Sequence, residues 1–104
     1  MNQVILVGRA KSKPVIKETA SKIQLGQLLI EVQKPYSNAE GIYETETFAV
    51  TLWRSLVEEC VKEINENSTV AIRGRLQDNN YRKDDGDVIY RNEIIAEKVC
   101  EHYN

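Results

Sequence analysis

The sequence has few of the residues on which most catalytic and metal sites depend. It contains one histidine, His102, near the C-terminus, and two cysteines, Cys60 and Cys100, which are far apart and form no Cys-x-x-Cys motif. No nucleophile elbow, phosphate-binding glycine loop or pair of histidines is present. We therefore expect a protein that is not an enzyme and has no metal and no cofactor. Both cysteines are expected to be reduced and to fill small buried apolar positions.

Long apolar segments are also missing. No run reaches the length of a membrane span, and the N-terminus has no hydrophobic signal segment, so we expect a soluble, cytoplasmic protein that does not bind membranes. The 104 residues fit one small domain, residues 1–104. Sixteen acidic against fourteen basic residues argue against a globally basic nucleic-acid-binding protein, although a local basic stripe is compatible with this balance.

Five segments have the apolar pattern of β-strands: residues 4–7, 23–32, 44–53, 69–82 and 88–99. Residues 10–22 are polar and broken by Pro14, which predicts a loop or a strained edge strand. A helix follows the third segment, because Val57, Cys60, Val61 and Ile64 form one apolar stripe. This order predicts an all-β OB-fold, a five-stranded Greek-key barrel with one α-helix between strands 3 and 4.

Local signals predict where two of these elements turn. Ser55 and Glu58 have the spacing of a capping box, which predicts the start of the helix. Asp85-Gly86 predicts a hairpin turn between the last two segments. The acidic run around this turn misses the spacing of a calcium loop, so we interpret it as a charged turn without metal.

Alternation along two segments predicts which side chains face outward. Phe48, Val50 and Leu52 share one face of the third segment, and Thr47, Thr51 and Trp53 the other. In the fourth segment, Val70, Ile72 and Leu76 face inward, and Arg73, Arg75 and Tyr81 face outward. An outward face of aromatics and cations is typical of proteins that hold single-stranded nucleic acid.

Simpler explanations exist for the same residues. Trp53 is also compatible with a partly buried core position, and the tyrosines with ordinary surface rings. Arg73 and Arg75 are also compatible with exposed strand positions that pair with Glu93 or Glu97 across the hairpin.

The first segment is apolar on both faces. Val4, Ile5, Leu6 and Val7 are consecutive, and a barrel interior covers only one side of a strand. In a chain of this length a second subunit is the economical cover for the other side. These four residues are therefore predicted to form a subunit interface.

Several motifs resemble one known family. They are the opening MNQVILVGR, KPY followed by AEG, TLWR before the helix, IRGRLQ, Tyr81 and the closing YRNEIIAEKV. Together they resemble the bacterial single-stranded DNA-binding proteins, from Met1 to about Cys100. The resemblance implies an OB-fold that assembles as a homo-oligomer, usually a homotetramer. It also implies binding of single-stranded DNA without base preference in replication, recombination or repair.

The resemblance also implies roles for individual residues. The stacking aromatics of the family fall on Tyr36, Trp53 and Tyr81, whereas a fourth ring of the family is replaced here by Thr47. Lys13 and Arg73 stand where the family often has acids, so this chain is expected to depend more on phosphate contacts. The predicted phosphate contacts are Lys13, Lys34, Arg54, Arg73 and Arg75.

The sequence stops at Asn104, without the flexible linker and acidic tip with which family members usually recruit partner enzymes. We therefore expect a naturally short or trimmed form, and no tail-mediated protein recruitment by this chain. The alternative interpretation is an OB-fold module that binds RNA or serves as a protein-interaction subunit of a replication complex. Sequence does not separate DNA from RNA, because stacking and phosphate contacts serve both.

Overall fold

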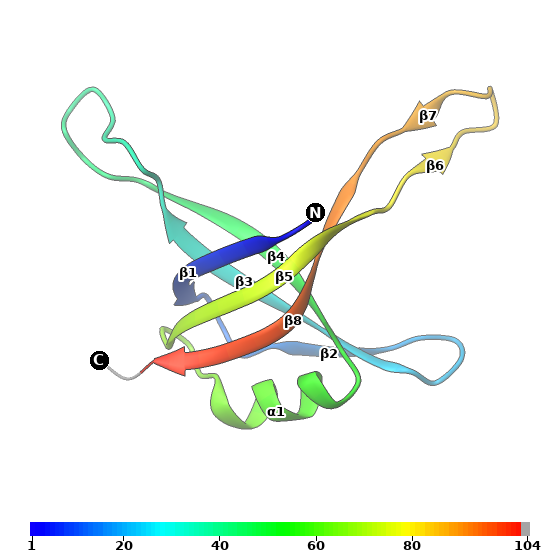
Figure 1. Ribbon diagram of the computed structural model, residues 1–104, viewed down its shortest axis with the longest axis horizontal. Helices are drawn as coiled ribbons and strands as arrows, with labels where there is room; N and C mark the ends of the chain where they lie inside the picture. The colour runs from blue at the N-terminus through cyan, green and yellow to red at the C-terminus, as the bar shows by residue number, and fades with distance from the viewer. Residues whose placement is uncertain (103–104) are drawn as a thin grey trace.

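The computed structural model describes residues 1–102, which form a β-barrel with one helix (Figure 1). The strands are β1 (Val4–Ala10), β2 (Val15–Glu18), β3 (Gln24–Gln33), β4 (Thr45–Trp53), β5 (Thr69–Asp78), β6 (Tyr81–Arg82), β7 (Val88–Ile89) and β8 (Asn92–His102). The helix α1 (Ser55–Glu63) lies between β4 and β5. Tyr103 and Asn104, the end of the predicted domain, lie outside the described residues.

Five strands close the barrel in the order β1, β5, β8, β4 and β3, because β3 pairs with β1 through Arg9 opposite Glu31 and Ala10 opposite Ile30. In chain order α1 follows the third of these strands. The all-β OB-fold prediction, a five-stranded barrel with the helix between strands 3 and 4, is therefore confirmed. Of the two possibilities for residues 10–22, the structure shows the edge strand, since β2 pairs with β3 alone.

The barrel core is formed by alternate residues of the strands, as the pattern predicts. Val50 and Leu52 of β4 and Val70 and Ile72 of β5 are fully or almost fully buried. The apolar stripe of α1 joins this cluster and covers one end of the barrel, seen below the strands in Figure 1. Among residues 1–102, no helix combines the length and apolar character that a membrane crossing requires.

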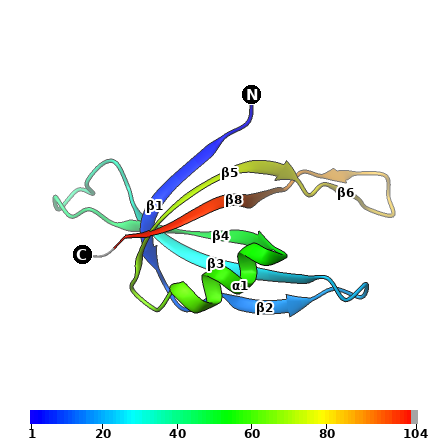
Figure 2. The same ribbon diagram turned by 60° about the horizontal axis from the view of Figure 1, so that its bottom comes forward.

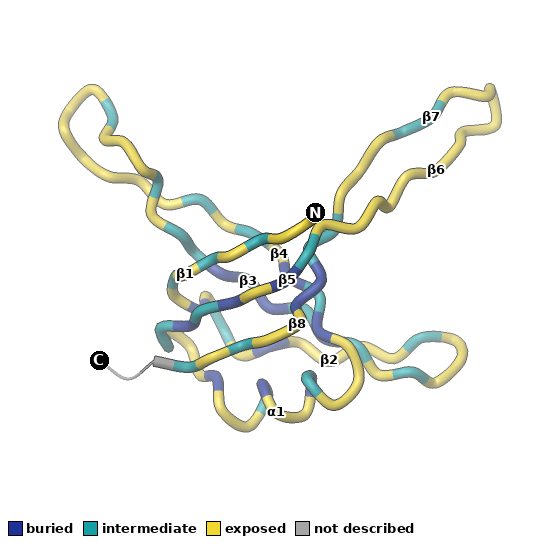
Figure 3. Tube along the Cα trace, viewed as in Figure 1, coloured by how far each residue is buried: buried dark blue, intermediate teal, exposed yellow. Residues whose placement is uncertain are grey.

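Long hairpins and loops project from the barrel, and they differ from it in how far their residues are buried. Buried residues gather in the barrel and on one side of α1, whereas the projecting segments are largely exposed (Figure 3). Leu76, predicted to face inward, is exposed. The alternation of β5 continues past the end of the barrel, where the inner side of the strand no longer faces the core.

The start of α1 differs from the prediction. Arg54 is the N-cap residue, and no side chain caps the helix, so the capping box of Ser55 and Glu58 is wrong. The reason is that β4 ends at Trp53 and α1 begins at Ser55. One residue is left to turn the chain, and Arg54 makes the turn with a φ angle of 53°.

The two cysteines have different environments. Cys60 is buried on α1, as expected. Cys100 is exposed, and the predicted buried role for it is wrong. It lies opposite Ala71 on the outer side of β8, where strand pairing turns it away from the core.

β5 and β8 continue as a two-stranded ribbon into the β6–β7 hairpin. The pairing offset stays constant from Gly74 opposite Ala96 to Arg82 opposite Val88. The predicted Asp85-Gly86 turn is confirmed, with Gly86 at a φ of 94° and its N–H donating to the carbonyl of Lys83. Because the offset is constant, residues that share a face in β5 share it in the hairpin.

Candidate nucleic-acid interface

Trp53 lies on the outer face of β4, as alternation predicts. It is 36% exposed and stands opposite Leu25 of β3. The side chains of Thr47 and Ala49 lie on the same face and are exposed. Trp53 is therefore a surface ring at the end of a barrel strand and not a core residue.

Tyr36 lies on a different segment, the loop of residues 34–44 between β3 and β4. Its side chain is 65% exposed. Internal hydrogen bonds hold this loop. The Asn38 side-chain oxygen accepts from the backbone N–H groups of Glu40 and Ile42 at 2.9 and 3.0 Å. The N–H of Lys34 donates to the carbonyl of Glu44 at 2.9 Å. Tyr36 is thus presented on a structured arm.

Tyr81 lies in β6, on the hairpin that continues β5 and β8. Its ring is 45% exposed, and the guanidinium of Arg91 lies 4.9 Å from the ring centroid. The constant pairing offset places Tyr81 on the same face of the ribbon as Arg75. Arg75 in turn stands opposite Ile95, whose other neighbour is Thr51 of β4. An outer row of residues therefore connects the face of β4 with the ribbon.

The segments with the three aromatics project in different directions. The loop of residues 34–44 and the β6–β7 hairpin extend from opposite sides of the barrel in both views (Figures 1 and 2). Trp53 lies at the junction of β4 and α1. Across a molecule of 45 × 37 × 26 Å, rings on three such segments suit an extended ligand that passes over the surface.

The five predicted phosphate contacts are divided among several places. Lys34 begins the loop that carries Tyr36, and Arg54 directly follows Trp53. Lys13 lies beside α1, where its Nζ donates to the carbonyl of Val61 at 3.3 Å. Arg73 lies between Ile5 of β1 and Lys98 of β8. Lys34 and Arg54 thus lie on or next to the segments that carry Tyr36 and Trp53. Arg75 shares the ribbon face of Tyr81, and Arg73 precedes Arg75 by two residues on the same strand. Lys13 lies apart from the three rings, beside α1.

The strand partners of the two arginines in β5 bear on the ion pairs considered for them. Lys98 stands directly opposite Arg73, and Ile95 opposite Arg75. Glu93 stands opposite Gln77, and its carboxylate accepts a 2.6 Å hydrogen bond from the hydroxyl of Thr51. Glu93 therefore has a partner on β4, and the register does not place a carboxylate directly across from either arginine.

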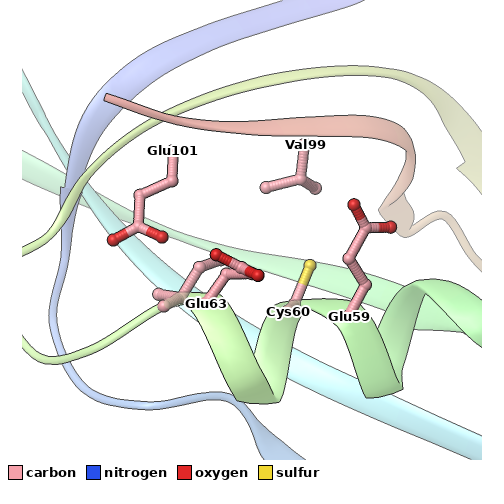
Figure 4. A pocket seen from close by; sticks show the side chains of 6 residues that line it. Glu59, Cys60, Glu63, Val99 and Glu101 are labelled. Atoms are coloured by element: carbon pink, nitrogen blue, oxygen red, sulfur yellow. The ribbon is translucent and has the colours of Figure 1, made fainter. Parts of the chain in front are cut away.

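A separate pocket lies between α1 and β8. The cavity has a volume of about 250 Å³ and is lined by Cys60, Val99 and the carboxylates of Glu59, Glu63 and Glu101 (Figure 4). Burial of the thiol and the charge of Glu59 raise the pKa of Cys60 to about 11. Three carboxylates repel phosphate, so this pocket is not part of a nucleic-acid surface. Within residues 1–102, no group of histidine, cysteine and acidic side chains could hold a metal ion.

Comparison with known proteins agrees with this geometry. The model of the single-strand binding protein family matches residues 1–101. The chain belongs to this family. It is 31% identical to "Single-stranded DNA-binding protein 3" of Listeria innocua over 95% of the chain and 62% of that protein. It is also 31% identical to "Single-stranded DNA-binding protein B" of Bacillus subtilis, over 94% of the chain and 87% of that protein.

The family members differ in how much of their length this chain matches. "Single-stranded DNA-binding protein 2" of Staphylococcus aureus is 27% identical over 95% of the chain and 70% of its own length. The Listeria innocua, Oceanobacillus iheyensis and Bacillus cereus relatives are covered over 62%, 62% and 58% of theirs. The matched part is the barrel domain described above.

Sequence reasoning did not single out several residues on the loop and hairpin that carry Tyr36 and Tyr81. Tyr43 shares the 34–44 loop with Tyr36, and Tyr90 precedes Arg91 at the base of the hairpin; both rings are exposed. Arg91 contacts Tyr81, ten residues away along the chain. The pairing implied by the Asp85-Gly86 turn was a signal that could have placed Arg91 beside Tyr81, because it sets the register of both strands.

Proposed function

We propose that this chain binds single-stranded DNA without base preference, by stacking bases on Tyr36, Trp53 and Tyr81. The observation that carries the proposal is the presence of three exposed rings on separate segments of a barrel from the single-strand binding protein family. Every base has a π-face, so stacking tolerates any sequence. An extended strand can reach rings that a compact ligand cannot.

Phosphate contacts complete the proposed interface. Lys34, Arg54 and Arg75 are the best placed, because they lie on or next to the segments of the rings or on the same face of the ribbon. Lys13 and Arg73 remain further members of the set. The total charge of −2 does not prevent this binding, because counterion release depends on the cations near the strand.

The wider role is also a proposal. The chain acts as a binding protein without catalytic activity, in the cytoplasm, and protects single strands during replication, recombination or repair. It assembles as a homotetramer. Within the assembly, Ile5 and Val7 are the contacts offered by β1, since Leu6 packs against the core and Val4 is half-buried.

Trp53 gives a direct test because it is the only tryptophan of the chain. Oligo-dT should quench its fluorescence, since a stacked base replaces water at the indole face. The Trp53→Ala variant should bind fluorescein-labelled oligo-dT about 1–3 kcal/mol more weakly than the unchanged protein, the usual scale of a base–aromatic stack. Trp53→Phe is the matched control and should retain most of the affinity. Unchanged emission at saturating DNA would contradict the stacking role.

The same anisotropy assay in a salt series tests the phosphate contacts. Affinity should fall steeply with salt, and Arg75→Ala should reduce the slope of log K against log[salt] by roughly one. Lys62→Ala, which removes an exposed lysine from α1, is the control and should leave the slope unchanged. Oligo-rU of equal length separates DNA from RNA binding: tighter binding of rU than dT would favour the RNA-binding alternative.

A further inference from the structure

Tyr81 and Arg91 are neighbours because of the register of the hairpin. Tyr81 stands opposite Ile89, and the constant offset places Arg91 one diagonal step away on the same face. Diagonal neighbours in an antiparallel pair lie within reach of aromatic and long side chains. The guanidinium carbon is 4.9 Å from the ring centroid, and Nη2 donates to the phenol oxygen at 3.3 Å. This is cation–π geometry with an additional hydrogen bond.

The backbone of Arg91 is fixed on both sides. Its N–H donates to the side-chain oxygen of Asn80 at 3.0 Å, and its carbonyl accepts from the N–H of Asn79 at 2.8 Å. These bonds lie where β5 passes into β6 and β7 into β8. These hydrogen bonds fix the backbone at the base of the β6–β7 hairpin. The exposed side chain of Arg91 therefore extends from a backbone whose position is defined.

Tyr81 borders a second environment besides Arg91. An open hollow of about 550 Å³ is lined by Tyr81 and by Arg82, Lys83, Asp84 and Asp85 at the hairpin turn. Arg91 is not part of this lining. Tyr81 therefore contacts a cation at Arg91 and also borders open space that Arg91 does not line.

We propose that Arg91 is a positioning residue for the Tyr81 stack. Its guanidinium covers one face of the ring, fixes the ring orientation and leaves the opposite face to a base. This deepens the proposed function and rests on it. The physical need is clear, because β6 and β7 pair through only two residues each and a short two-stranded ribbon alone is marginally stable. A ring held in its bound orientation loses less conformational entropy when the base arrives.

A double-mutant cycle tests the proposal, with Arg91→Ala, Tyr81→Ala and the double variant measured by anisotropy on fluorescein-labelled oligo-dT. Arg91→Ala should weaken binding about two- to fivefold, the range of an exposed cation–π contact. In the Tyr81→Ala background the same change should have little effect, because Arg91 acts through the ring. An equal loss in both backgrounds would overturn the proposal and make Arg91 an independent contact.

Arg91→Lys separates position from charge. Lysine keeps the charge but lacks the planar guanidinium, so the salt slope should be retained while most of the loss in affinity persists. Full recovery of affinity by lysine would count against positioning. Tyr81→Phe keeps the ring contact and removes the hydroxyl acceptor, and should stay close to the unchanged protein. Thermal unfolding should be the same for all variants, since the arm lies outside the barrel.

A measurement without DNA distinguishes the failure of this inference from the failure of the proposed function. In the free protein, NMR should show upfield ring-current shifts of the Arg91 side-chain protons, and Tyr81→Leu should remove them. Absence of these shifts overturns the positioning role even if DNA binds. If the unchanged protein does not bind oligo-dT, the proposed function and this inference are both wrong. If the unchanged protein binds oligo-dT but the affinity losses of Arg91→Ala and Tyr81→Ala are additive in the double variant, only this inference is wrong.

Discussion

Among single residues, Cys60 shows most clearly how burial changes chemistry. It belongs to the apolar stripe of α1, and its thiol is removed from water between the helix and β8. Burial, with the charge of Glu59 as a smaller cause, raises its pKa from 9.0 to about 11. The folded protein therefore favours the neutral thiol of Cys60 over its thiolate. Cys100, by contrast, is exposed on β8.

The Cys60 thiol makes stability depend on alkaline pH. In the unfolded chain it ionises near 9.0, whereas in the folded chain it stays protonated until about 11. Ionisation between these values favours the unfolded state, so the free energy of unfolding should fall as pH rises from 9 to 11. Denaturant titrations at several pH values measure this fall. Cys60→Ala is the control, and the decline should be smaller in that variant; an identical decline would place its cause in other groups.

At the scale of elements, the junction between β4 and α1 combines strain with a proposed functional role. Arg54 has φ 53° and ψ −125°, outside the regions that ordinary residues prefer. Its N–H donates to the carbonyl of Gln24 at 3.2 Å, and its carbonyl accepts from Val57 at 3.0 Å. These two hydrogen bonds, together with β4 and α1 on either side, keep Arg54 in this strained conformation. The turn separates the outward ring of Trp53 from the helix that covers the core.

Two substitutions separate strain from charge at Arg54. Arg54→Gly removes the guanidinium and relaxes the backbone, whereas Arg54→Ala removes the guanidinium and keeps the strain. The glycine variant should be more stable than the alanine variant by about 1 kcal/mol, measured by urea unfolding. Both variants should lose the same affinity for oligo-dT, because both lack the cation. Equal stability of the two would show that this turn is not strained.

At the scale of the whole molecule, apolar side chains of β1 are exposed on the outer face of the barrel, and no element of residues 1–102 covers them. Ile5 and Val7 of β1 are 66% and 54% exposed. Their partners on β5 are Arg73 and Ala71, and Ala71 continues to Cys100 on β8. Exposed apolar side chains that gather on one strand are typical of an interface, because their exposure to water is unfavourable. We propose that further copies of the chain cover them.

A charge on this face should prevent assembly. Ile5→Asp should convert the oligomer to smaller species in sedimentation velocity, because a carboxylate buried against an apolar partner surface is costly. The barrel should remain folded by circular dichroism, since Ile5 points away from the core. Ile16→Asp on the edge strand β2 is the control and should leave the assembly unchanged. A stable monomer for the unchanged chain would refute the interface.

The sequence by itself determined the features that follow from local geometry. Strand alternation placed Val50 and Leu52 inside and Trp53 outside, and the helical period placed Cys60 and Ile64 against the core. Alternation and helical period are properties of the backbone within one element, so a short window of sequence is enough to read them. The order of these elements, with one helix after the third strand, was then enough to predict the barrel.

Only the tertiary structure decided features that depend on pairing between distant segments. Leu76 follows the inward pattern but lies beyond the end of the barrel, and Cys100 is turned outward by its register with β5. Arg54 occupies the N-cap position of α1 because it is the one residue between the end of β4 and the start of the helix. Arg91 meets Tyr81 because the hairpin register brings them to one face. These positions depend on where each strand ends and on the register with which it pairs with its neighbours. Contacts between residues far apart in the sequence fix the strand ends and the register.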